Sequence, residues 1–276
     1  MKRLFFFAAY DPQNIVSKTT IHYLESLCRL GDVVFFADSD LPRKELDSLR
    51  PFVLYSGGVH HREYDFGSYK RCWEWVSANL ETGAYDVLYL VNDSVYGPLR
   101  PLEPCVGRME ALGTDAFAMV LNPKKKEPHL QSWFIGVRKT VFLSGWFGDF
   151  LRSVCRQDNK VDVCRQYETG FTSLLLSRGV ICDALFKVKG KKIYNGVWPL
   201  FRSGLPFVKK SAFSRHGGSL GGQLARIMSW ISPSVKKIIE DDLDRQFGPG
   251  YSKKLLTRNP FVIAGRYVSY LSRKLF

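Results

Sequence analysis

The sequence predicts an α/β protein, with a mostly parallel open sheet flanked by helices and a basic, helical C-terminal extension. Short runs rich in Val, Leu and Phe alternate with longer amphipathic segments, which is the order of strands and crossover helices. Several short runs are apolar throughout, as expected of strands that helices cover on both faces. Near residue 190 the alternation gives way to loops rich in Gly, Lys and aromatic residues.

The elements follow in order from these patterns. The strands are expected at residues 2–10, 32–37, 52–55, 87–92, 116–122 and 132–137. The helices are expected at residues 19–30, 68–80, 102–112, 140–155 and 168–177, the last of them stopping at Arg178-Gly179.

Length and composition limit the class further. With 276 residues and 45% hydrophobic content, the chain can bury a sizeable core. We predict a domain at residues 1–220 and a basic amphipathic extension at residues 221–276. The apolar run 4–10 is too short to span a bilayer, and Asp11-Pro12 is not a cleavage site, so a cytoplasmic protein is expected. The six Cys residues are scattered, which favours reduced core thiols over zinc or disulfides.

The net charge of +14 is unevenly distributed. Residues 1–186 hold 22 basic and 22 acidic side chains, whereas residues 187–276 hold 18 basic and 4 acidic ones. A surface of this kind favours anionic partners such as nucleotide diphosphates or anionic lipid. Because no nucleic-acid-binding motif occurs, nucleic acid is not an expected partner.

Residues 85–99 contain the strongest functional signal. They read Tyr-Asp-Val-Leu-Tyr-Leu-Val-Asn-Asp-Ser-Val-Tyr-Gly-Pro-Leu, an apolar strand that ends at Asp93. Open α/β sheets bind ligands outside the carboxyl ends of their strands, and a carboxylate there can hold the cation that neutralises a diphosphate. The alternative is that Asp93 and Ser94 simply start a turn.

A second group of polar residues joins a strand to the helix expected at 68–80. Asp65 or Ser68 can cap that helix, and the amino end of the helix suits an anionic ligand. His61 and Lys70 supply further donors for hydroxyls or phosphate. The alternatives are a simple helix cap for Asp65 and solvated surface positions for the two basic residues.

Four motifs resemble the rhamnan synthesis protein F family in type and order. They are Tyr-Asp-Phe-Gly-Ser-Tyr-Lys (64–70), Val-Asn-Asp-Ser-Val-Tyr-Gly-Pro-Leu (91–99), His-Leu-Gln-Ser-Trp-Phe (129–134) and Pro-Phe-Val-Lys (206–209). The resemblance covers about residues 1–210. It implies a GT-A-like, Rossmann-related glycosyltransferase that transfers rhamnose or a similar sugar from a nucleotide-sugar donor to O-antigen, capsule or cell-wall polysaccharide.

The resemblance also implies site residues. Asp93 falls where such enzymes keep a DXD motif for Mn²⁺ or Mg²⁺, although Asn-Asp-Ser supplies one carboxylate instead of two. The alternative to a metal is that the 13 basic residues of 207–276 partly substitute for it. Lys209 and Lys210 are expected near the donor diphosphate. Tyr69 and Asn92 are assigned to the donor site with their motifs.

An inverting hexosyl transfer needs a general base near the acceptor hydroxyl. Glu168, at the start of the last core helix, is the candidate base, because GT-A enzymes commonly place an acid there. Asp162 is the second candidate. The alternative for Glu168 is that its charge merely complements the helix dipole.

Further donor-site or acceptor-site residues come from two loops. His129, Gln131 and Ser132 can bond sugar hydroxyls, although the alternation of a strand puts Gln131 and Trp133 on one face and Ser132 on the other. Asp11, after the first strand, can reach the nucleotide base or ribose, and a turn Asp before Pro12 is an equal alternative. His216 can approach the metal or be polar surface.

The last residues suggest a membrane surface. Residues 261–276 mix large apolar side chains with Arg and Lys at helical spacing, which suits a helix lying in an anionic interface. We therefore expect a polyprenyl-linked glycan acceptor and a peripheral position on the inner face of the cytoplasmic membrane. The alternative function is a non-catalytic GT-A-like module that binds anionic lipid or a partner synthase.

Overall fold

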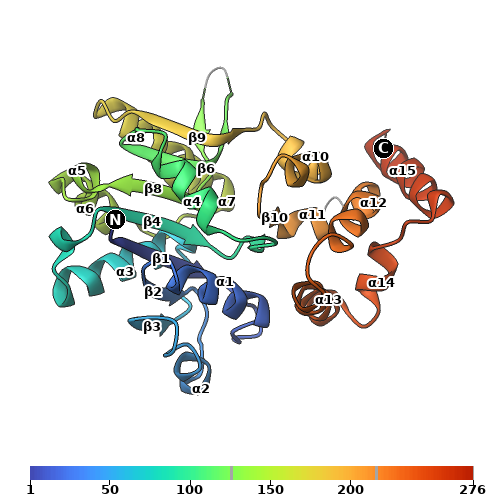
Figure 1. The fold of residues 1–276 in the computed structure, drawn as a ribbon, viewed down its shortest axis with the longest axis horizontal. Helices are drawn as coiled ribbons and strands as arrows, with labels where there is room; N and C mark the ends of the chain where they lie inside the picture. The colour runs from blue at the N-terminus through green and yellow to red at the C-terminus, as the bar shows by residue number, and fades with distance from the viewer. Residues whose placement is uncertain (125–126, 215–216, 276) are drawn as a thin grey trace. The chain divides into compact units, whose positions relative to one another are not determined.

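The computed structural model describes residues 1–124, 127–214 and 217–275. The chain forms two compact units (Figure 1). Unit 1 contains residues 1–93 and 102–188, and unit 2 contains residues 94–101 and 189–276. Because these units reflect packing alone, the domain boundary expected after residue 220 stays a prediction.

Unit 1 is built on an open sheet. Its strand order is β3-β2-β1-β4-β8-β6-β7, and β9 pairs with β6. The pairs β1–β2, β2–β3, β1–β4 and β6–β9 are parallel, whereas β8 runs antiparallel to β4 and β6, and β7 to β6. The strands are β1 (Arg3–Ala9), β2 (Asp32–Ala37), β3 (Tyr55–Gly58), β4 (Val87–Asn92), β6 (Ala116–Asn122), β7 (His129–Leu130), β8 (Phe134–Arg138) and β9 (Cys182–Lys187).

Helices cover both faces of this sheet, as the apolar strands predict. In β1, Phe7 packs on Tyr23 of α1 with ring centroids 5.2 Å apart, while Phe6 packs on Trp73 of α3 at 6.5 Å. Alternate strand residues therefore contact helices on opposite sides. The helices of unit 1 are α1 (Lys18–Cys28), α2 (Arg43–Asp47), α3 (Tyr64–Asn79), α4 (Glu103–Glu110), α5 (Lys139–Phe142), α6 (Gly145–Arg152), α7 (Lys160–Val163) and α8 (Gly170–Ser177), with a 3₁₀ turn at Thr82–Ala84 and a π-helical segment at Cys164–Thr169.

The predicted α/β class is confirmed, but several boundaries are wrong. The third strand is β3, not residues 52–55. It contains Gly57 and Gly58, which lie so close to Phe36 and Leu41 that an added Cβ atom would force these side chains to shift. Glycines give no apolar signal, so the sequence pattern missed this part of the strand. The helix expected at 140–155 is two helices, since Ser144 is extended and begins α6. The edge strand β9 was not predicted, because its side chains are mostly half-buried and Asp183 and Lys187 limit its apolar run to three residues.

Unit 2 combines a two-stranded antiparallel ladder with helices. In the ladder Val208 pairs with Tyr96 and Lys209 with Val95. The Tyr96 hydroxyl donates a 2.8 Å hydrogen bond to the buried carboxylate of Asp242, which ties the ladder to α13. The elements are β5 (Val95–Tyr96), α9 (Lys192–Asn195), α10 (Val197–Arg202), β10 (Val208–Lys209), α11 (Lys210–Ser214), α12 (Gly217–Met228), α13 (Pro233–Phe247), α14 (Tyr251–Leu255) and α15 (Pro260–Leu275).

Among the described residues, no helix combines the length and the apolar character that crossing a bilayer requires.

Candidate active site

The candidate site lies at the carboxyl ends of β1 and β4. These strands are parallel neighbours with Ala8 opposite Asn92, and the Asp93 amide donates to the Ala8 carbonyl at 3.1 Å. Asp11 and Asp93, which follow the two strands, line one pocket together with Phe35 and Ala37 of β2 and with apolar residues such as Ile15. The pocket thus has an apolar wall and two carboxylates, those of Asp11 and Asp93.

Asp11 fits both interpretations made from the sequence. Its Oδ1 accepts the Gln13 amide at 2.8 Å, which is an Asx turn. Its backbone is fixed by Ser39, whose Oγ accepts the Asp11 amide at 2.9 Å and donates to the Asp11 carbonyl at 3.0 Å. The residue is therefore a turn former that also faces the pocket.

Asp65, Tyr69 and Asn92 form one hydrogen-bonded group, in which Asn92 directly precedes Asp93 in the chain. The Asn92 amide donates to Asp65 Oδ2 at 2.8 Å and also bonds Tyr69. Burial raises the pKa of Tyr69 well above its usual value, so its hydroxyl stays protonated and donates to the Ser132 carbonyl at 3.3 Å. Because Tyr69 and Asn92 are fully buried, the structure gives them a supporting position rather than direct access to a ligand.

Glu168 is connected to the same set through Ser132. Its Oε1 accepts the Ser132 hydroxyl at 3.1 Å. The sequence placed Glu168 at the start of an α-helix, but it lies in the π-helical segment Cys164–Thr169 that precedes α8. Such segments are rare and often occur at functional sites. Asp162, the second candidate base, is engaged on the surface by Arg165 at 2.7 Å and Asn159 at 2.7 Å.

The remaining predicted residues of unit 1 lie elsewhere. The Lys70 ammonium donates to the Val154 carbonyl at 2.9 Å. Gln131 accepts the Trp133 indole N–H at 2.9 Å in a buried contact, so these two side chains do share a face, as predicted. His129 Nδ1 lies 3.2 Å from the Glu127 carbonyl near the hairpin of β6 and β7.

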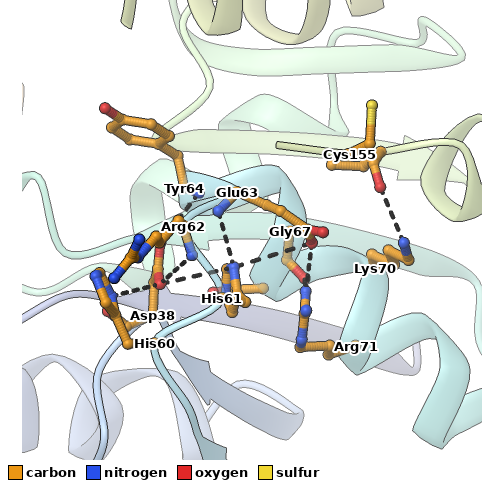
Figure 2. Close-up of polar contacts among 12 residues, drawn as sticks. Asp38, His60, His61, Arg62, Glu63, Tyr64, Gly67, Lys70, Arg71 and Cys155 are labelled. Atoms are coloured by element: carbon orange, nitrogen blue, oxygen red, sulfur yellow. Dashed lines mark hydrogen bonds and ion pairs between the residues drawn. The ribbon is translucent and has the colours of Figure 1, made fainter. Parts of the chain in front are cut away.

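His61 is buried in a network that the sequence did not predict (Figure 2). Its Nδ1 accepts the Glu63 amide at 3.1 Å, and its Nε2 lies 3.1 Å from Ser68 Oγ. Burial lowers the pKa of His61 to about 4. Beside it, the carboxylate of Asp38 bonds the backbone of residues 62 and 64. The available sequence signal was that Asp38, like Asp93, directly follows a buried strand.

Lys209 and Lys210 belong to unit 2. The Lys209 ammonium donates to Ser94 Oγ at 3.1 Å, and the Lys210 amide donates to the Ser94 carbonyl at 2.9 Å. The Lys210 ammonium also lies 5.5 Å from the centre of the Tyr96 ring. Within unit 2, both lysines are thus bonded to Ser94. His216 lies outside the described residues.

The sequence family follows from a comparison with known proteins. The model of rhamnan synthesis protein F matches residues 33–261, which is most of the chain. The chain belongs to the rhamnan synthesis protein F family. The resemblance inferred from four motifs is thereby confirmed, and with the open α/β sheet of unit 1 it confirms the GT-A-like fold class. Membership of the rhamnan synthesis protein F family supports a glycosyltransferase of polysaccharide synthesis.

Solved structures show remote likeness to this family member. TarS 1–349 from S. aureus has 10% identity, with 93% of this chain and 90% of TarS covered and a TM-score of 0.42. A cytidylyltransferase from Leptospira borgpetersenii has 10% identity, coverage of 89% and 95%, and a TM-score of 0.43. Core-mannan synthase A from Aspergillus fumigatus, in an Mn/GDP form, has 11% identity, coverage of 55% and 63%, and a TM-score of 0.31. No curated protein matches the chain.

The carboxylates of the pocket are candidate ligands for a divalent cation. Within the described parts of the chain, no three His, Cys, Asp or Glu side chains are grouped as metal ligands. However, Asp11 and Asp93 both line the pocket. Mg²⁺ is usually bound through one or two carboxylates, with water and substrate phosphates as the other ligands. The oxygen donors therefore fit a cation that is shared with a diphosphate.

Proposed function

We propose that this protein is an inverting hexosyltransferase that moves rhamnose or a similar sugar from a nucleotide donor to a growing, lipid-linked surface polysaccharide such as O-antigen, capsule or cell-wall glycan. The observation that carries the proposal is the pocket at the carboxyl ends of the strands, which Asp11 and Asp93 both line in a member of this family. Ligands of open α/β sheets bind at such strand ends.

The two sides of the pocket suit the two parts of the donor. The apolar wall, which includes Ile15, suits a nucleobase, and Asp11 suits the hydroxyls of a ribose. Asp93 would hold a Mn²⁺ or Mg²⁺ ion that neutralises the diphosphate. Lys209 and Lys210 are proposed to supply further positive charge for the same group, because Lys209 ends the family-like motif Pro-Phe-Val-Lys (206–209) and Lys210 follows it.

The proposed reaction exchanges one bond at C1 of the donor sugar and transfers one proton. The acceptor hydroxyl oxygen attacks C1 of the donor sugar while the bond from C1 to the diphosphate oxygen breaks, and the nucleoside diphosphate leaves with that electron pair. The acceptor proton passes to Glu168. The hydrogen bond from Ser132 to Oε1 orients the carboxylate for this role.

A donor screen tests the proposal. Wild-type protein is incubated with dTDP-, UDP- and GDP-linked sugars, and the nucleoside diphosphate released is measured. We expect turnover with one donor class and a loss of roughly 100-fold or more in Asp93→Asn, because charge on the diphosphate is no longer balanced. Asp86→Asn is the matched control. Asp86 directly precedes the first residue of β4, at the end of the strand opposite to Asp93; its side chain is exposed and accepts a hydrogen bond from the Lys2 amide.

Equal loss in both variants, or none in Asp93→Asn, contradicts the assignment of Asp93. Nucleotide-sugar binding without turnover of any donor contradicts catalysis and favours the non-catalytic module.

We also propose that unit 2 contacts the inner face of the cytoplasmic membrane. Unit 2 holds 18 basic and 4 acidic residues, so it carries the whole net charge of +14. On α15, Phe261 is 86% and Val268 66% exposed, while Ile263 faces Gly222 of α12. A helix with one packed side, one exposed apolar side and basic neighbours suits an anionic lipid surface.

Vesicle flotation tests this contact. Phosphatidylglycerol vesicles should bind the protein at low salt, and phosphatidylcholine vesicles should not, because basic residues near the surface are attracted to anionic lipid. Phe261→Ser with Val268→Ser should release it, whereas Val161→Ser, at a 74% exposed site in unit 1, should not. Equal binding to both vesicle types, or no effect of the double variant, contradicts the proposal.

A further inference from the structure

The loop between β3 and α3 is fastened to one buried carboxylate. Asp38, whose side chain is only 7% exposed, accepts the Arg62 amide on Oδ1 at 2.8 Å and the Tyr64 amide on Oδ2 at 3.2 Å. His60 Nδ1 lies 3.0 Å from the same Oδ1. Figure 2 shows these three groups converging on Asp38 from one loop. Both carboxylate oxygens therefore hold the loop.

The loop needs this support because its backbone is unfavourable. Arg62 has a φ of 62° and Tyr64 a φ of 58°. A side chain with a Cβ atom rarely adopts a positive φ, which glycine tolerates best. Such residues persist when the surroundings determine them, and they concentrate at functional sites. Two of them within three positions, both bonded to Asp38, indicate a conformation that is imposed.

A second contact fixes the loop from the other side. Glu63 pairs with Arg71 of α3 at 2.6 Å, and its amide donates to the buried, neutral His61. His61 in turn lies 3.1 Å from Ser68 Oγ, one turn into α3. The loop is thus bonded both to the end of β2 and to the first turns of α3.

The imposed conformation sets the position of Asp65. Asp65 directly follows Tyr64 in α3, and its Oδ2 accepts the Asn92 amide at 2.8 Å. Asn92 is the last residue of β4 and precedes Asp93. A shift of the loop would therefore change the hydrogen bond that supports the strand end carrying Asp93.

We propose that Asp38 is a positioning residue, which holds the loop 60–64 so that Asp65 and Asn92 support Asp93 in the pocket. The inference rests on the proposed function, because it assumes that Asp93 serves the donor diphosphate. Asp38 itself touches no substrate in this account, and it does not line the pocket.

Kinetics of Asp38→Asn test the proposal, with nucleoside diphosphate affinity measured by calorimetry. The side-chain amide of this variant has only one oxygen, so it cannot accept hydrogen bonds from both the Arg62 and the Tyr64 backbone amides. The loop should then loosen and misplace Asp93, and kcat/KM should fall roughly 10- to 100-fold. Adding Arg62→Gly should restore part of the loss, because glycine adopts a positive φ without support from Asp38.

Glu110→Gln is the matched control. The Glu110 carboxylate is also buried, and it bonds Arg3 at 2.6 Å and Tyr89 at 2.8 Å, at the amino end of β1. It should lower the melting temperature and leave kcat and KM unchanged.

A second pair of variants acts on the loop without changing Asp38. Arg62 is exposed, so Arg62→Val and Arg62→Gly remove the same charge. A β-branched residue opposes a positive φ, so Arg62→Val should reproduce the kinetic loss and Arg62→Gly should not. This comparison decides the question even if Asp38→Asn does not fold.

Two results would overturn the inference. One is wild-type kcat/KM and diphosphate affinity in Asp38→Asn; the other is equal kinetics for Arg62→Val and Arg62→Gly. If either result is obtained while Asp93→Asn is inactive, only the role of Asp38 is rejected. Full activity of Asp93→Asn rejects the proposed site itself.

Discussion

The side-chain amide of Asn92 donates a 2.8 Å hydrogen bond to the carboxylate of Asp65, which joins the end of β4 to the first turn of α3. Asn92 is almost fully buried. The residue before the predicted metal ligand is therefore neutral for a structural reason: a second carboxylate there would face Asp65. This explains physically why the motif reads Asn-Asp-Ser and supplies one acid.

The first prediction concerns this pair. Asn92→Asp should lower the free energy of unfolding at pH 7.5 by roughly 1–3 kcal/mol, because it replaces a hydrogen bond with two adjacent carboxylates. Urea denaturation measures the change. The exchanged pair, Asp65→Asn with Asn92→Asp, should recover most of it. Unchanged stability in the single variant would show that the contact contributes nothing.

The second prediction concerns the cation. If Asp93 holds a cation shared with the diphosphate, EDTA should abolish turnover and Mn²⁺ or Mg²⁺ should restore it. Calorimetry supplies a second readout, since a nucleoside diphosphate should bind more tightly with Mn²⁺ in the wild type but not in Asp93→Asn. Full activity in EDTA would instead favour stabilisation by Lys209 and Lys210, and Lys209→Ala with Lys210→Ala should then be inactive.

The strands that carry the site were predictable from the sequence alone. The bounds of β4 and β2 were predicted without error, because each is a continuous apolar run that must be covered on both faces. Asp93 follows such a run, so its place at the edge of the sheet required no further information. The same reasoning located Asp11 at the end of β1.

The supporting contacts were not predictable in this way. The bonds from Asp38 to the backbone of residues 62 and 64 join positions 24 and 26 residues apart, and no local pattern indicates them. The π-helical segment containing Glu168 also has no periodic signature that differs from an α-helix over six residues. Local propensity fixes where strands lie, whereas the loop conformation depends on which polar groups the fold brings together.

The third prediction concerns pH and the buried His61. Its pKa is lowered to about 4 mainly by burial, while the unfolded chain has the usual value near 6.5. Between these values the unfolded state binds the proton and the folded state does not. Stability should therefore be complete above about pH 6.5 and fall as the pH drops towards 4.

Melting temperatures at pH 7.5 and 5.0 measure this effect. Other groups act on His61: Asp38 and Glu63 favour its charged form, and Arg71 and His60 oppose it. His61→Gln should flatten the pH dependence in this range, since the amide does not titrate. His129→Gln is the control, because His129 lies near the hairpin of β6 and β7. Equal slopes for wild type and His61→Gln would contradict the prediction.

The last prediction concerns Glu168. A general base acts on the transition state more than on ground-state binding, so Glu168→Gln should lower kcat by roughly 10²–10⁴-fold with little change in donor affinity. The amide keeps an oxygen to accept the Ser132 hydroxyl, so the orientation of the side chain is preserved and only the proton acceptor is lost. Asp162→Asn is the matched control, because Asp162 is engaged at the surface by Arg165 and Asn159. A loss of kcat in Asp162→Asn but not in Glu168→Gln would make Asp162 the general base. A loss of donor binding in Glu168→Gln would place Glu168 in the donor site instead.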